Sequence, residues 1–262
     1  MSPRQPTETV RRTTTHRWGE ERAIDIIARG KVVVPATWIM PPSSGRVPVV
    51  LLLHGLSSNK ERMSSSAGRA LATRGIGSLA IDLPMHGERR EGNPRDMLSN
   101  PLALVGAWRA AVKEVRDIIT WLDGQDAVDA SRLAVLGYSL GGFLALMAAA
   151  EDDRLRVVAL AAAGDLPDAT PYASMVRALV DPPRAARKLR GRPLLLVNGR
   201  ADTTTRPAQA ERLFAAAEEP KTMLWYDGGH WPPATCINET ADWLQGELDL
   251  LASDADSDRR TS

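Results

Sequence analysis

The sequence is poor in cysteine, histidine and aromatic residues. Its 262 residues contain one cysteine, Cys236, which excludes an internal disulfide and a thiolate-rich zinc or iron–sulfur site. The histidines are too few to favour an all-histidine metal cage, so we expect no metal and no other cofactor. The four histidines are His16, His54, His86 and His230.

The sequence also lacks net charge and long apolar segments. Lys and Arg total 33 and Asp and Glu total 32, a net charge of +1 that does not favour a nucleic-acid or acidic-membrane partner. The longest apolar segments, Val47–Leu53 and Val157–Ala163, are much shorter than the ~18 residues of a membrane span. Residues 1–17 contain no apolar segment typical of a secretory signal, so we expect a cytoplasmic protein.

The length and the order of patterns predict one large α/β domain. Domains of this class reach roughly 200–250 residues, and the sequence contains neither a Gly/Ser-rich linker nor an internal repeat. We expect a flexible arm over residues 1–17, one domain over 18–251 and a disordered tail over 252–262. The tails are polar and charged, and nothing in them predicts packing.

Short β-rich segments alternate with helical patterns, which predicts a mostly parallel, eight-stranded sheet with helices on both faces. The first two strands form an antiparallel hairpin, and the later ones read as buried strands. The predicted strands are residues 21–27, 32–40, 47–54, 76–82, 132–136, 157–163, 193–198 and 222–226. The predicted helices are residues 63–74, 108–122, 143–150, 207–217 and 234–251.

One motif carries chemistry. The pattern G-x-S-x-G spans Gly137–Gly141, with Ser139 between a buried strand and a helix rich in small residues. A serine on such a sharp strand-to-helix turn exposes its hydroxyl as a nucleophile. The alternative is a serine that only caps the helix. Nucleotide binding is disfavoured, because there is no G-x-G-x-x-G and Phe143 follows Gly142 where a phosphate-binding loop needs Lys and Ser or Thr.

A serine nucleophile needs a base and an acid to orient that base. His230 follows the last strand in a Gly-rich loop, whereas His54 and His86 are better explained as structural residues. For the acid, Asp202 follows the strand before that loop and is the main candidate. Asp165, which follows the preceding strand, remains the alternative.

Five segments in register with the strands resemble the α/β-hydrolase family over residues 18–250. They include the chain order Ser, Asp, His that is typical of this family. The segments are His54-Gly55, Asp82–Gly87, Gly137–Gly141, Asn198–Asp202 and Gly229-His230. The resemblance implies an oxyanion hole formed by the backbone N–H groups of Leu56 and Leu140.

Within this family, the segments Leu53–Glu61 and Pro84–Arg89 look like the bacterial carboxylesterase and dienelactone-hydrolase-like branch. Dienelactone hydrolases use cysteine as nucleophile, and dehalogenases and epoxide hydrolases use aspartate, whereas this chain has Ser139. Cofactor-free haloperoxidases usually carry an aromatic residue where Leu56 stands. The resemblance therefore implies a serine carboxylesterase.

The expected reaction is hydrolysis of small or medium esters through an acyl-enzyme. A thioesterase, a peptidase and a non-catalytic binding protein with the same fold remain alternatives, and a homodimer is left open. The segment of about residues 166–188 is long enough only for a small cap, so the site is open or lightly covered. The expected substrate-binding residues are Met63, Tyr172, Met175, Leu179 and Trp231.

Overall fold

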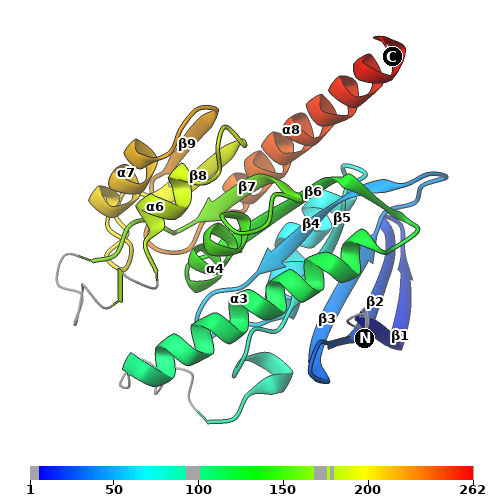
Figure 1. The fold of residues 1–262 in the computed structure, drawn as a ribbon, viewed down its shortest axis with the longest axis horizontal. Coiled ribbons are helices and arrows are strands. Elements are labelled where there is room, and N and C mark those ends of the chain that lie inside the picture. Colours follow the sequence, from blue (N-terminus) through cyan, green and yellow to red (C-terminus); the bar gives the residue numbers. More distant parts are fainter. Residues whose placement is uncertain (1–5, 93–100, 168–175, 178–179, 262) are drawn as a thin grey trace.

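The computed structural model describes residues 6–92, 101–167, 176–177 and 180–261, without the side chains of 101–105 and 254–261. Its centre is a nine-stranded sheet in the order β1-β2-β3-β5-β4-β6-β7-β8-β9 (Figure 1). The pairs β1–β2, β2–β3 and β3–β5 are antiparallel, and the other pairs are parallel. The strands are β1 (Thr7–His16), β2 (Gly19–Ala28), β3 (Val32–Met40), β4 (Val47–Leu53), β5 (Gly77–Ile81), β6 (Val128–Tyr138), β7 (Leu155–Ala161), β8 (Leu194–Gly199) and β9 (Lys221–Tyr226).

Helices lie on both faces of this sheet, as the alternating pattern predicts. The segment predicted as one helix over residues 63–74 begins three residues earlier and contains a π-helical turn. The helical elements are α1 (Lys60–Met63), the π-helix η1 (Ser64–Gly68), α2 (Arg69–Ala72), the 3₁₀ turn η2 (Gly87–Arg89), α3 (Pro101–Asp123), α4 (Leu140–Ala149), α6 (Pro182–Arg187), α7 (Pro207–Ala216) and α8 (Ala234–Thr261).

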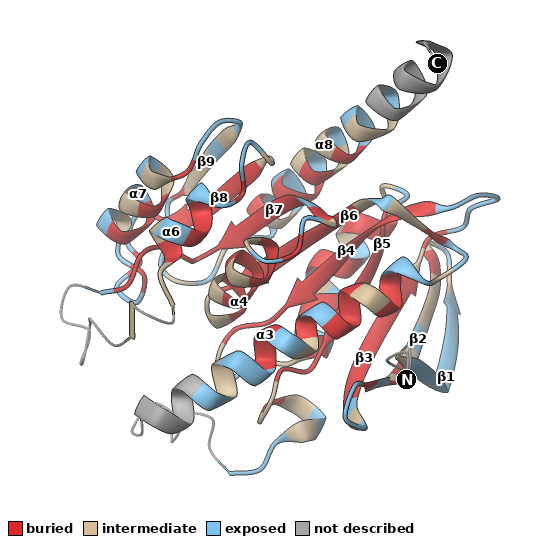
Figure 2. Ribbon diagram, in the orientation of Figure 1, coloured by how far each residue is buried: buried red, intermediate tan, exposed pale blue. Residues whose placement is uncertain are grey.

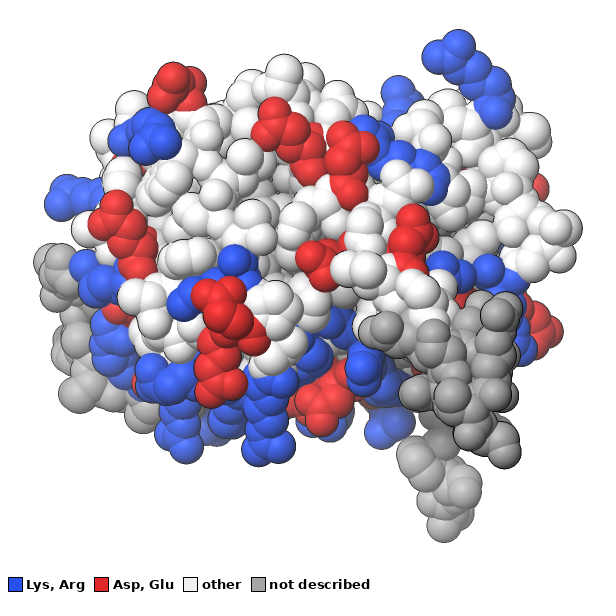
Figure 3. Space-filling view, turned by 90° about the horizontal axis from the view of Figure 1, so that it is seen from above, with Lys and Arg blue, Asp and Glu red and all other residues white. Residues whose placement is uncertain are grey.

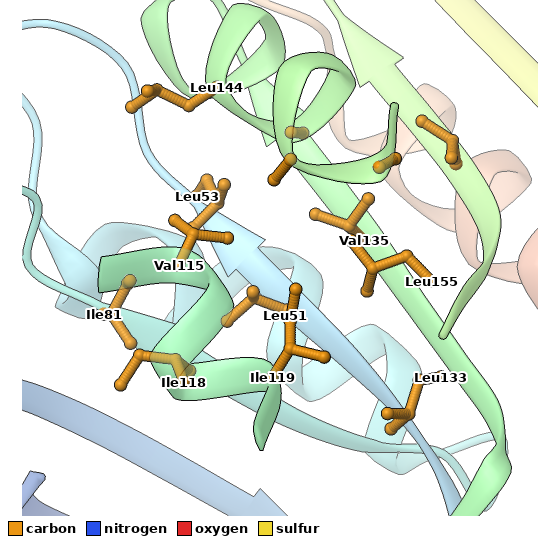
Figure 4. Packing of buried hydrophobic residues seen from close by; sticks show 14 of the residues in the cluster. Leu51, Leu53, Ile81, Val115, Ile118, Ile119, Leu133, Val135, Leu144 and Leu155 are labelled. Carbon is orange, nitrogen blue, oxygen red and sulfur yellow. The ribbon is translucent and has the colours of Figure 1, made fainter. Parts of the chain in front are cut away.

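The two faces of the sheet carry two hydrophobic cores, because successive side chains of a strand point to opposite faces. On one face, Leu51 and Leu53 of β4 pack with Val115 and Ile118 of α3 and with Leu144 of α4 (Figure 4). The central strands are buried along their length (Figure 2). Each fully buried aliphatic side chain contributes roughly 1.5–3 kcal/mol, so this face anchors the strand ends that carry the site.

The opposite face of β4 supports the second core. Val50 and Leu52 lie with Leu71 of α2 and with Leu244 and Leu248 of α8, all buried. Because α2 and α8 pack against each other over this face, the start of α8 lies close to the helical segment that follows β4. That closeness brings together chain segments that are about 170 residues apart, as in the hydrogen bond from Gln245 Nε2 to the carbonyl oxygen of Arg74.

The strand count corrects the prediction of a flexible N-terminal arm. Residues 7–16 form β1, an edge strand paired antiparallel with β2, and they account for the ninth strand. Nearly every β1 side chain is exposed, so no apolar alternation marks the strand in the sequence. Backbone hydrogen bonds to β2 hold it, and its charged side chains suit an exposed edge.

The predicted disordered tail is also corrected. Helix α8 continues to Thr261, and Figure 1 shows it projecting past the sheet. No Gly or Pro interrupts residues 247–261, so nothing in the backbone chemistry stops the helix. Of the predicted cap over 166–188, the described residues include α6, and residues 168–175 and 178–179 lie outside the described part.

The surface is mixed in charge, in keeping with the near-neutral composition. Seen from above, Lys and Arg are most dense along the lower edge of the view, and uncharged residues with scattered Asp and Glu cover its centre (Figure 3). Within the described ranges, no helix combines the length and the apolar composition that crossing a bilayer requires.

Candidate active site

Ser139 sits on a strained turn between β6 and α4. Its φ of 51° and ψ of −113° lie outside the regions that L-residues usually adopt. A Cβ on Gly137 would lie 2.2 Å from the carbonyl oxygen of Gly141, and one on Gly141 would lie 2.1 Å from that of Leu53. The two glycines of the motif are therefore required by close backbone approach, as a nucleophile elbow requires.

His230 lies in the loop after β9, with its ring against Ser139. Its Nε2 is 2.9 Å from Ser139 Oγ, the distance of a hydrogen bond donated by the serine hydroxyl. Two tyrosines hold the loop: Tyr226 Oη donates to the Gly229 carbonyl at 2.9 Å, and Tyr138 Oη donates to the His230 carbonyl at 3.2 Å. Burial raises the pKa of Tyr226 to about 12, so its hydroxyl remains a donor.

Asp202 completes the chain of hydrogen bonds. Its Oδ2 lies 2.8 Å from His230 Nδ1, which donates to it in the tautomer that leaves Nε2 free to accept. Its Oδ1 accepts the backbone N–H groups of Thr204 and Thr205 at 2.8 and 3.0 Å. The carboxylate is fully buried and is oriented by these donors, while the imidazole keeps 18% of its surface exposed.

The alternative acid, Asp165, is occupied elsewhere. Its carboxylate pairs with Arg177 at 2.9 Å and with Arg212 at 3.2 Å. Burial alone would raise its pKa, but the hydrogen bond from Arg177, with those from the Leu166 N–H and Arg212, lowers it. The structure thus places Asp202, and not Asp165, beside His230.

The loop between β4 and α1 lies against the serine. A Cβ on Gly55 would meet the Tyr138 ring at 2.7 Å and Ser139 Cβ at 3.3 Å, so only glycine allows this approach. This loop carries Leu56. Leu140 is the first residue of α4, and the backbone N–H groups of a helix's first turn have no acceptor within the helix. The two predicted oxyanion donors therefore lie on the two segments that flank Ser139.

His54 holds this loop from below. It is fully buried, with Nδ1 2.8 Å from the Gly55 carbonyl and Nε2 accepting the Leu83 N–H at 3.1 Å. Burial lowers its pKa to about 4, with the nearby His86 ring acting in the same direction. His86 is buried too, and its Nδ1 lies 2.8 Å from the Pro84 carbonyl. Both histidines therefore have the structural environments expected from the sequence.

A buried lysine that sequence reasoning missed fixes the far end of the loop. Lys60, which is 1% exposed, lies 3.0 Å from Asp82 Oδ2 and also pairs with Glu61 and Glu88. Burial alone would lower its pKa, but the hydrogen bonds to these three carboxylates raise it. Asp82 also accepts the backbone N–H groups of Lys60 and Glu88 at 2.9 and 3.0 Å. The segment Asn59–Glu61 belongs to the family resemblance seen in the sequence, but no neighbouring residue indicates that Lys60 is buried.

Two of the five predicted substrate-binding residues line a cavity beside the site. Met63 and Trp231 are among its wall residues, and the Trp231 ring stacks on Tyr138 at 4.9 Å between centroids. Tyr172, Met175 and Leu179 lie outside the described residues. Among the residues that the structure describes, no cluster of three His, Cys, Asp or Glu side chains is placed to hold a metal ion.

Comparison with known proteins agrees with this architecture. The family model of the alpha/beta hydrolase fold matches residues 48–186. An uncharacterized protein of Mycobacterium tuberculosis is 28% identical over 227 residues, which are 80% of this chain and 76% of that protein. Among solved structures, a cold-adapted esterase from an Arctic intertidal metagenomic library has a TM-score of 0.70 at 21% identity, over 91% of this chain and 98% of the other. An acetyl xylan esterase from Paenibacillus sp. R4 has a TM-score of 0.74 at 19% identity, over 94% and 89%. At these identities the two structures establish a shared fold.

Proposed function

Because this chain belongs to the α/β-hydrolase fold family, we propose that it is a serine hydrolase that cleaves carboxylic esters through an acyl-enzyme. The observation that carries the proposal is the continuous hydrogen-bond chain from Ser139 Oγ through His230 to Asp202. An ordinary serine hydroxyl is a weak nucleophile, and a base within hydrogen-bond distance is what activates it.

In the first step, Ser139 Oγ attacks the ester carbonyl carbon while His230 Nε2 takes the hydroxyl proton. The tetrahedral intermediate collapses as His230 gives that proton to the leaving alcohol, and the acyl group stays on Ser139. In the second step, His230 takes a proton from water, the hydroxide attacks the acyl carbon, and His230 returns the proton to Ser139. The ester and one water thus become an acid and an alcohol.

Two further features support this sequence of steps. Asp202 is proposed to stabilise the imidazolium that forms twice in each cycle, and its two backbone donors hold its carboxylate in place for this role. The N–H groups of Leu56 and Leu140 are proposed to bind the oxygen of the tetrahedral intermediate. A donor of this kind contributes roughly 3–4 kcal/mol to transition-state stabilisation in comparable sites.

The proposal is tested with three substrate classes and two matched serine variants. Wild type, Ser139→Ala and Ser65→Ala are assayed against p-nitrophenyl esters, an acyl-CoA and a peptide anilide, and each is exposed to a fluorophosphonate probe. Ser65 is an exposed helical serine whose hydroxyl bonds only its own helix. We expect wild type and Ser65→Ala to cleave esters and to be labelled, and Ser139→Ala to do neither.

Other outcomes would change the assignment. Preferred cleavage of the acyl-CoA or the anilide would make the protein a thioesterase or a peptidase with the same groups. A wild type that neither cleaves nor labels would favour a hydrolase-fold binding protein. Labelling that persists in Ser139→Ala would place the nucleophile elsewhere.

A further inference from the structure

A cavity of about 360 Å³ lies on the face of the sheet that packs against α8. It is bordered by the carboxyl ends of β6, β7 and β8, by α1 and η1, by the first turns of α8 and by the loop after His230. Its volume is within the range of about 300–1,000 Å³ that small-molecule sites have. It is therefore large enough for part of a ligand.

The cavity adjoins the loops that carry the catalytic groups. Tyr138 directly precedes Ser139, Trp231 directly follows His230, and Ser58 lies two residues after Leu56; all three line the wall. The ring centroids of Tyr138 and His230 are 5.4 Å apart. Ser139 and His230 are not themselves wall residues, and the cavity adjoins their loops through these neighbouring residues.

The cavity has an exposed rim and a buried floor. Trp231 at the rim is 56% exposed, and the Arg62 guanidinium lies 5.1 Å above its ring. The floor is formed by Leu136, Val197 and Cys236, all buried. A chain that enters past Trp231 can leave water and contact side chains that are already packed into the core.

Three hydroxyl groups of the wall are already engaged with the backbone. The hydroxyl of Ser66 donates to the Arg62 carbonyl at 2.6 Å, and that of Thr240 donates to the Cys236 carbonyl at 2.7 Å. The Tyr138 hydroxyl donates to the His230 carbonyl. What these residues present to the cavity is mainly carbon, so an apolar group would lose little by leaving water, whereas a sugar would lose hydrogen bonds.

The wall also contains the π-helical turn η1, with Ser66 and Ala67 facing the cavity. Single π-helical turns inside α-helices are rare and occur frequently at functional sites. The turn is a second feature, independent of the lining chemistry, that is in keeping with a binding surface here.

We propose that this cavity binds the apolar chain of the substrate and so sets its length preference. The inference rests on the proposed ester hydrolysis, and it narrows the substrate class to esters with a medium apolar chain in place of acetylated sugars. The chain belongs either to the acyl group or to the alcohol. Two ester series separate these sources: p-nitrophenyl esters of increasing acyl length, and acetate esters of increasing alcohol length.

The test fills and enlarges the cavity. Ala67→Leu adds carbon atoms to the wall, and Ile237→Ala removes them from the first turns of α8. Ala70→Leu is the matched control, because Ala70 belongs to the same helical segment and does not line the cavity. In the ester series whose varied chain occupies the cavity, we expect Ala67→Leu to lower the ratio of kcat/KM for the eight-carbon ester to that for the two-carbon ester by about tenfold or more. Ile237→Ala should shift the preference to longer chains, and Ala70→Leu should behave as wild type.

A binding measurement keeps this inference separate from the esterase proposal. Octanoate and 1-octanol are titrated by calorimetry into Ser139→Ala, with and without Ala67→Leu. Binding of either compound that weakens about tenfold in the double variant supports the cavity even if no ester is cleaved. If neither compound binds Ser139→Ala, or if Ala67→Leu and Ala70→Leu give the same length profile on cleaved esters, the inference is overturned while the esterase proposal stands.

Discussion

Lowering the pH from about 7.5 to about 5 is expected to destabilise the protein through His54. This imidazole is fully buried, and its Nε2 accepts the N–H of Leu83, a hydrogen bond that would be lost if this nitrogen took up a proton. Burial lowers its pKa from 6.5 to about 4, helped by the His86 ring 5.1 Å away between centroids and partly opposed by the Gly55 carbonyl and by Asp82. The histidine is therefore neutral in the folded protein across this pH range.

The size of the effect follows from proton linkage. In the unfolded chain His54 titrates near 6.5, so by about pH 5 it is mostly protonated there and mostly neutral in the folded state. Because the unfolded state then binds more protons, the free energy of unfolding falls as the pH falls below about 6.5. The loss reaches about 2 kcal/mol at about pH 5, as an order of magnitude.

Urea denaturation at the two pH values measures this directly, with His54→Gln as the comparison. The variant is less stable at both values, but it lacks the titrating group, so its stability should fall by about 2 kcal/mol less than that of wild type. His86, whose pKa burial also lowers, remains in both proteins and cancels in the comparison. Equal falls in the two proteins would show that His54 does not contribute to the pH dependence.

Three further substitutions test the parts of the site. Lys60→Met leaves the fully buried Asp82 without its cation and should lower the free energy of unfolding in urea by about 3–5 kcal/mol. The double variant Lys60→Met/Asp82→Asn should recover part of this loss. An unchanged free energy of unfolding in Lys60→Met would contradict a buried ion pair. Asp202→Asn should lower kcat by about 10⁴-fold in an ester assay, whereas Asp165→Asn should leave kcat near that of wild type; the reverse pattern would identify Asp165 as the acid. Gly55→Ala places a methyl 2.7 Å from the Tyr138 ring, and the displaced loop should lower kcat by about 10²-fold with a smaller change in KM; unchanged kcat would separate this loop from catalysis.

The succession of the strands after β1 along the chain, and the placement of Ser139, Asp202 and His230 after strand ends, could be predicted because they depend on local patterns. Val47–Leu53 is nearly continuous in apolar residues and is buried at every position. Such a segment is typical of a central strand in a sheet that is covered on both faces. The chemistry-bearing loops follow directly from the ends of such strands. The family model matched to residues 48–186 supports the same fold.

The features that were missed depend on partners that are distant in the sequence. Strand β1 is polar and exposed, and it exists because β2 offers an unpaired edge. The burial of Lys60 is created by Asp82 and Glu88, which lie 22 and 28 residues further along the chain. The cavity forms where η1, α8 and the strand ends come together. The residues next to Cys236 and Thr240 in the sequence therefore do not indicate that these two line a cavity. Pairing, burial and voids of this kind are properties of the assembled fold.

The most direct test of the serine mechanism is the mass of the protein during turnover. Wild type is mixed with p-nitrophenyl octanoate, quenched in acid within the first turnovers, and mapped by peptide mass spectrometry. We expect an octanoyl group on Ser139, trapped by the acid quench before water removes it in the proposed second step. Ester cleavage by wild type with no acylated peptide, or an acyl group on another residue, would contradict this mechanism.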